Sequence, residues 1–150
     1  MQLPTALRRR CFQIAYRVLR AYWFVRRPHH DGVKCVLTDA GSVLLVRHSY
    51  GPPEWELPGG AVKRGEPPEQ AISRETAEEL GLTITQWTDL GMIKMRLQAK
   101  HETLYCFHAE LHEPKLTLDR GEIDAAAWFD RRRLPGPLGD SVIPILARLP

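Results

Sequence analysis

The chain has 150 residues, of which 43% are hydrophobic and 26% charged, a composition typical of one soluble domain with a substantial core. No apolar run approaches the roughly 20 residues that a membrane-spanning helix needs. The three cysteines are far apart and fit neither a zinc spacing nor a disulfide framework, so we expect a reducing, cytoplasmic location. The net charge of +3 is unevenly distributed, because residues 1–30 hold seven arginines and no acid, which leaves −4 for residues 31–150.

Residues 5–25 are predicted to form a basic amphipathic helix, which divides the chain into a helix with its linker (1–30) and a domain (31–150). Apolar residues recur at spacings of three and four and form one stripe: Leu7, Cys11, Ile14, Val18, Tyr22 and Val25. Three interpretations stay open. Such a stripe usually packs on its own domain or on a second subunit, as in a homodimer. Trp23, Phe24 and the arginines also suit peripheral contact with an anionic membrane, and arginine-rich, acid-poor helices serve as organelle-targeting presequences.

A linker and a β-hairpin are expected next. Pro28 should end the helix, and residues 29–32 are interpreted as the linker. Residues 33–38 and 42–47 are predicted strands, joined by Asp39-Ala40-Gly41, because Asp and Gly between two apolar runs are typical of a hairpin turn.

The densest group of charged residues lies between Gly60 and Leu82. Pro67-Pro68 fits the start of a helix and Gly81 its end. Three acidic residues share one face of that helix, because residues three and four apart are neighbours: Glu75, Glu78 and Glu79. Carboxylates so close together repel one another, and hard divalent cations such as Mg²⁺ take oxygen ligands. The stretch therefore predicts a metal site on a helix, and the residues on the opposite face should bury against a sheet: Ala71, Ile72, Thr76 and Leu80.

The rest of the chain indicates further strands and a short final helix. Residues 83–96 are rich in β-forming residues, with Gly91 indicating a bulge or bend. Residues 104–111 form a clear strand. A last helix can be capped by Asp140 or Ser141. The pattern by itself supports an α+β domain with hairpins and two or three helices.

The letters G-x5-E-x7-R-E-x-x-E-E-x-G-hydrophobic, from Gly60 to Leu82, resemble the signature box of the Nudix hydrolases. Seven fixed letters match, and chance agreement is on the order of 10⁻⁸ per starting position. Thr76 stands where the family usually has an aliphatic residue. Residues 55–60 are similar to the family's lead-in, and fainter similarity extends over residues 32–130. The resemblance implies an α/β/α sandwich with a mixed β-sheet.

The resemblance also implies a set of site residues. The metal ligands would be the Gly60 carbonyl, Glu75, Glu78 and Glu79. Arg74 would hold a carboxylate in place by bidentate hydrogen bonding, and Glu66 would bind the loop backbone at the start of the helix. Glu75 is the first choice for general base, and Glu122 is its competitor.

A further carboxylate is expected from a later loop. Glu122 lies six residues before Trp128-Phe129, where the family has an acid near the metals. The resemblance therefore implies that Glu122 is a metal ligand or a group that orients water. Asp119 and Asp124 are weaker candidates.

Three basic residues are candidates for contact with substrate phosphates: Arg47, Lys63 and Arg64. For Arg47 a surface ion pair is an equal alternative. Trp55 is interpreted as an anchor of its loop in the core, with stacking on a nucleobase as the other option.

The function implied by the resemblance is hydrolysis of the pyrophosphate bond in a nucleoside diphosphate linked to another group. Mg²⁺ is the expected cofactor, with Mn²⁺ as the substitute. Nucleoside triphosphates and nucleotide sugars head the expected substrates, and no nucleic-acid partner is predicted. The alternative is a non-catalytic nucleotide-sensing or interaction module on the same fold.

Overall fold

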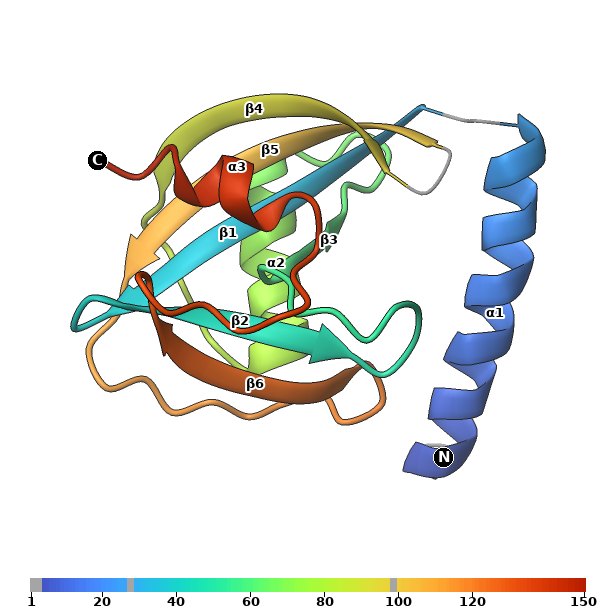
Figure 1. Ribbon diagram of the computed structural model, residues 1–150, viewed down its shortest axis with the longest axis horizontal. Coiled ribbons are helices and arrows are strands. Elements are labelled where there is room, and N and C mark those ends of the chain that lie inside the picture. Colours follow the sequence, from blue (N-terminus) through green and yellow to red (C-terminus); the bar gives the residue numbers. More distant parts are fainter. Residues whose placement is uncertain (1–3, 27–28, 98–99) are drawn as a thin grey trace.

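The computed structural model describes residues 4–26, 29–97 and 100–150. Its elements, in chain order, are α1 (Thr5–Arg26), β1 (His29–Asp39), β2 (Ser42–His48), β3 (Gly59–Ala61), α2 (Pro68–Leu80), β4 (Thr88–Leu97), β5 (Lys100–Glu110), β6 (Ile123–Asp130) and α3 (Val142–Leu146). The strands form one mixed sheet in the order β4-β5-β1-β2-β6, and β3 joins it by pairing with β1 (Figure 1). β1 runs parallel to β5, whereas the pairs β1–β2, β1–β3, β2–β6 and β4–β5 are antiparallel.

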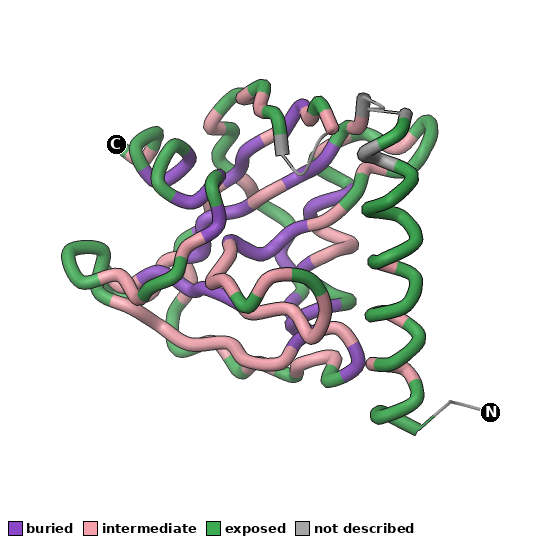
Figure 2. The backbone as a smooth tube through the Cα atoms, turned by 45° about the vertical axis from the view of Figure 1, so that its right-hand side comes forward, coloured by how far each residue is buried: buried purple, intermediate pink, exposed green. Residues whose placement is uncertain are grey.

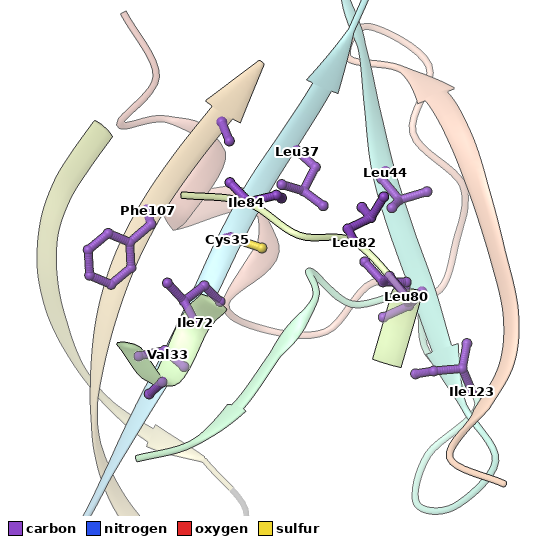
Figure 3. Packing of buried hydrophobic residues seen from close by; sticks show 13 residues of the cluster. Val33, Cys35, Leu37, Leu44, Ile72, Leu80, Leu82, Ile84, Phe107 and Ile123 are labelled. Carbon is purple, nitrogen blue, oxygen red and sulfur yellow. The ribbon is translucent and has the colours of Figure 1, made fainter. Parts of the chain in front are cut away.

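Two helices cover the two faces of this sheet, with α2 behind it and α3 in front of it in Figure 1. Val33 and Cys35 of β1 face α2, whereas Val36 faces α3, because successive strand residues point to opposite sides. In the hydrophobic cluster between α2 and the sheet, Ile72 and Leu80 of α2 pack against the strand side chains (Figure 3). Each large aliphatic side chain buried in this way contributes about 1.5–3 kcal/mol. The α/β/α sandwich with a mixed sheet is therefore confirmed.

The predicted hairpin is present. Asp39 pairs with Ser42, which leaves Ala40 and Gly41 as a two-residue turn. Both turn residues have positive φ, 47° and 82°, as a tight hairpin turn requires.

The linker expected at residues 29–32 is wrong. These residues open β1 and pair in parallel with residues 101–104 of β5. That ladder satisfies their backbone groups, and a distant strand supplies it, so the local sequence gave no signal for it. Pro28 lies outside the described residues.

The helix α1 forms over the predicted range, but its orientation differs from one expectation. It stands beside the sheet and covers neither face (Figure 1). Most of its residues are exposed (Figure 2), and five residues of the apolar stripe are 45% to 77% exposed: Leu7, Ile14, Val18, Tyr22 and Val25. The expectation that the stripe packs on its own domain is wrong, because the polar and aromatic side of α1 docks there. Packing of the stripe on a second subunit, contact with a membrane surface and organelle targeting stay predictions. No helix in the described ranges is long and apolar enough to cross a bilayer.

The strand β4 begins later than its sequence indicated. Residues 83–87 precede it without regular structure, and β4 starts at Thr88. The register shifts between Asp89 and Gly91, where Gly91 has φ 81°, so the predicted bulge is confirmed. The final helix α3 starts directly after Ser141, but the Ser141 side chain forms no capping hydrogen bond.

Candidate active site

The helix α2 has the predicted ends and the predicted buried face. It begins at Pro68, and Gly81 ends it in the left-handed conformation with φ 68°. Thr76 is fully buried, and its hydroxyl donates a hydrogen bond to the carbonyl oxygen of Ile72 at 2.9 Å. The departure from an aliphatic residue therefore leaves no unpaired hydroxyl in the core.

Two glycines let the loop at β3 approach both the sheet and α2. Gly59 has φ 150°, and a Cβ at this position would overlap the carbonyl oxygen of Val33. A Cβ built on Gly60 would lie 2.6 Å from both carboxylate oxygens of Glu75. The Glu75 carboxylate consequently lies against the backbone of Gly60.

Arg74 of α2 is the centre of a hydrogen-bonded network that joins this helix to the segment between β3 and α2. Its guanidinium donates from Nε and Nη2 to the two oxygens of Glu66 at 2.8 and 2.9 Å, the predicted bidentate geometry. It also donates to Glu75 Oε1 at 2.7 Å, Glu78 Oε2 at 3.3 Å and the Ala61 carbonyl at 3.0 Å. One side chain thus orients three carboxylates and the loop.

Glu66 has the structural role predicted for it. Besides the bonds from Arg74, its Oε2 accepts a hydrogen bond from the backbone N–H of Lys63 at 2.9 Å. The Arg74 guanidinium, followed by that backbone bond, lowers the pKa of Glu66 to about 2. Glu66 is therefore a permanent anion that fixes both Arg74 and the loop.

Glu79 is the most unusual residue of the helix, because it is an acidic residue that is only 2% exposed. Its Oε2 has no hydrogen-bond partner among the described residues. Burial raises the pKa of Glu79 to about 8, Lys34 on β1 partly offsets that rise, and the charges of Glu75 and Glu122 add to it. A buried carboxyl oxygen without a hydrogen-bond partner costs about 1–3 kcal/mol of stability.

The predicted carboxylates are close enough to raise one another's pKa values, and they differ in exposure. Burial raises the pKa of Glu75 against the opposing effect of Arg74. Burial, followed by the negative charges of Asp119 and Glu75, also raises the pKa of Glu122, which directly precedes β6. Glu78 is the outermost, with its side chain 58% exposed. Carboxylates from α2 and from the start of β6 therefore share one negative field.

The donor set fits a divalent cation. As the side chains stand, no three His, Cys, Asp or Glu residues within the described ranges converge on a single point, and Arg74 holds Glu75 and Glu78. The unpartnered Glu79 oxygen and the repulsion among the acids are what a cation relieves. All candidate ligands are oxygens, the type that Mg²⁺ prefers.

Of the three basic residues predicted to contact phosphate, one forms an ion pair and two are exposed. Arg47 Nη2 forms an ion pair with Asp124 Oδ2 at 2.9 Å, the alternative considered for it, and its guanidinium lies 5.2 Å from the centroid of the Trp55 ring. Trp55 packs edge-on against Phe129 with ring centroids 5.0 Å apart, as an anchor would. Lys63 and Arg64 are exposed in the loop before α2.

Tyr50 is a residue near the site that sequence analysis does not identify. Burial and the negative charges of Glu79, Glu122 and Glu75 raise the pKa of its phenol, which places it in the field of the acidic cluster. It reaches there from the loop after β2. A lone tyrosine in a Gly-Pro-rich loop carries no local signal for such a position.

An acidic, helix-borne cluster of carboxylates on an α/β/α sandwich is thus defined. The profile of the NUDIX domain matches residues 28–149, and the chain belongs to that family.

Individual relatives match parts of the chain. An 8-oxo-dGTP diphosphatase from Proteus vulgaris is 39% identical over 67 residues, which are 45% of this chain and 60% of that protein. The NAD-capped RNA hydrolase NudC from Chromobacterium violaceum is 31% identical over 111 residues, 73% of this chain and 41% of that protein. The chain thus spans 60% and 41% of these relatives' lengths. The MutT NUDIX hydrolase structure from Burkholderia pseudomallei superposes with a TM-score of 0.74 at 26% identity, covering 81% of this chain and 98% of that one.

Proposed function

We propose that the protein is a divalent-metal-dependent hydrolase of nucleotides, which cleaves the pyrophosphate bond of a nucleoside diphosphate linked to another group. The observation that carries the proposal is Glu79, a buried carboxyl with an unpartnered oxygen beside Glu75 and Glu122. Membership of the family supports the same chemistry. So do the names of two relatives, an 8-oxo-dGTP diphosphatase and an NAD-capped RNA hydrolase.

The ligands for the cation would be Glu75, Glu78, Glu79 and Glu122, with the Gly60 carbonyl. A bound Mg²⁺ or Mn²⁺ would neutralise phosphate charge and activate water. Arg74 keeps Glu75 oriented through the bond at 2.7 Å and offsets part of the negative charge.

Glu75 is the preferred general base, and Glu122 is the competitor. Each has a pKa raised by burial, which brings a carboxylate closer to the pH at which it can take a proton from water. Glu75 is held by Arg74 and lies against Gly60, so its position is better determined.

The test compares two variants of α2 on a panel of nucleoside triphosphates and nucleotide sugars, with Mg²⁺ or Mn²⁺ present and products identified. Glu79→Gln should lose turnover by at least about 100-fold while its circular dichroism spectrum stays close to that of the wild type. Glu69→Gln is the matched control, since Glu69 is an exposed residue in the first turn of the same helix. Full activity of Glu79→Gln would reject the proposal. Nucleotide binding by the wild type without any product would instead favour the sensing module.

A further inference from the structure

The loop of residues 48–52 connects the acidic cluster to α1. The Ser49 backbone N–H donates to the Glu122 carbonyl at 2.8 Å, and its hydroxyl donates to the Gly121 carbonyl at 2.6 Å. Tyr50, next in the chain, lies in the field of the carboxylates. Whatever lies beside this loop is therefore close to the proposed site.

One face of α1 packs on the same loop. Gln13 Nε2 donates to the Ser49 carbonyl at 3.3 Å. The Phe12 ring stacks on Tyr50 with centroids 5.8 Å apart, and the Tyr16 ring meets Tyr50 at 5.7 Å. These contacts hold α1 against the loop that carries Tyr50.

A cavity of about 480 Å³ lies between α1 and the loop. Its lining residues are Gln13, Tyr16, Arg17, Arg20, Ser49, Tyr50, Gly51 and Pro52. Its volume falls in the range of small-molecule sites. Four of the eight lining residues thus belong to α1.

The cavity lining provides positively charged side chains rather than exposed faces of aromatic rings. The Tyr50 ring already meets the rings of Phe12, Tyr16 and His48, so little of it is left for a nucleobase. Arg17 and Arg20 form no hydrogen bond or ion pair with any described residue. Two guanidinium groups beside a cavity match the charge and geometry of phosphate oxygens.

We propose that this cavity binds the terminal phosphate of a nucleoside triphosphate, with Arg17 and Arg20 as its ligands, so that α1 forms part of the substrate site. The inference rests on the proposed hydrolase function and narrows it. A terminal phosphate needs the two positive charges, whereas the neutral sugar of a nucleotide sugar does not.

The experiment compares Arg17→Ala, Arg20→Ala and the double variant with the wild type, using dGTP and UDP-glucose as substrates. The KM for dGTP should rise about 10-fold for each arginine removed, with kcat nearly unchanged, because each loses a charged hydrogen bond. The KM for UDP-glucose should not change. Arg17→Lys should recover part of the loss, since it keeps the charge. Arg10→Ala is the matched control, an exposed arginine of α1 that does not line the cavity.

Direct binding separates this inference from the proposed function. Calorimetric titration of inorganic triphosphate in EDTA should show about 10-fold or greater weakening in the double variant and none in Arg10→Ala. Equal affinity in the wild type and the double variant overturns the inference, as does an unchanged KM for dGTP or turnover of UDP-glucose alone. Lack of turnover on every substrate, with triphosphate binding still dependent on the two arginines, would reject the hydrolase function and leave the anion site standing.

Discussion

Arg8 Nη2 lies 2.9 and 2.8 Å from the two carboxylate oxygens of Asp119, which follows it by 111 residues. Asp119 Oδ1 also accepts the backbone N–H of Gly121 at 2.9 Å, and the Arg8 guanidinium packs on Gly121. The pair therefore connects the first turns of α1 to the loop that presents Glu122.

Arg8→Ala is expected to loosen this loop more than it destabilises the fold. Both side chains of the ion pair are partly exposed, so the free energy of unfolding should fall by no more than about 1 kcal/mol. Amide hydrogen exchange in residues 119–123 should become faster, and turnover should fall severalfold because Glu122 is less well positioned. Arg10→Ala serves as the control, and unchanged exchange in both variants would contradict the role given to Arg8.

Gly60→Ala is expected to displace Glu75, since the added Cβ would lie 2.6 Å from its carboxylate oxygens. We expect a loss of about 1–3 kcal/mol in unfolding free energy and about 100-fold in kcat. Adding Glu75→Asp shortens the acid and should restore much of the stability without restoring turnover. A Gly60→Ala protein with wild-type melting temperature and activity would show that the close packing has no consequence.

Local rules account for the parts of the fold that short sequence separations determine. The spacing of Glu75, Glu78 and Glu79 places them together on any helix, and Gly81 ends that helix by its backbone freedom. The two-residue hairpin turn follows from its own composition.

Long-range pairing accounts for what the sequence did not predict. The stripe on α1 indicated that its apolar side would be buried. Instead, Arg8 and Arg9, which lie off the stripe, form ion pairs with Asp119 and Asp124 of the domain. Both acids are more than 100 residues away in the chain, so no local pattern reveals them. Tyr50, which lies in the field of the carboxylates, packs against Phe12 and Tyr16 of the same helix. Glu122 was placed by family resemblance rather than by its neighbours in sequence.

Arg74→Lys is expected to be harmful although it keeps the charge. A lysine cannot donate the two parallel bonds to Glu66 while also reaching Glu75. Urea unfolding should show a loss of about 1–3 kcal/mol, and kcat should fall by about 10- to 100-fold because Glu75 moves. In the Glu66→Gln background the same substitution should cost less stability, a coupling that a double-mutant cycle measures. Additive effects would mean that Arg74 and Glu66 act independently.

The buried acid Glu79 should make the metal-free protein less stable as pH rises. Burial raises its pKa from 4.5 to about 8 in the folded state, whereas the unfolded chain keeps the ordinary value. Between these two values the folded protein holds a proton that the unfolded chain has lost, so unfolding releases a proton and the free energy of unfolding falls with pH. The fall begins above about 4.5 and levels off above about 8. Its size should be on the order of a few kcal/mol.

Urea unfolding in EDTA at several pH values between 5 and 9 measures this effect as the difference between wild type and Glu79→Gln. The glutamine is neutral at every pH, so Glu79→Gln should gain stability relative to the wild type as pH rises, while the other titrating groups largely cancel. Mg²⁺ should then restore the wild type at high pH, because a cation replaces the proton as partner of the carboxylate, and it should do so much less for the variant. A difference that stays constant with pH would mean that Glu79 is ionised throughout, and the strained buried acid on which the metal site depends would not exist.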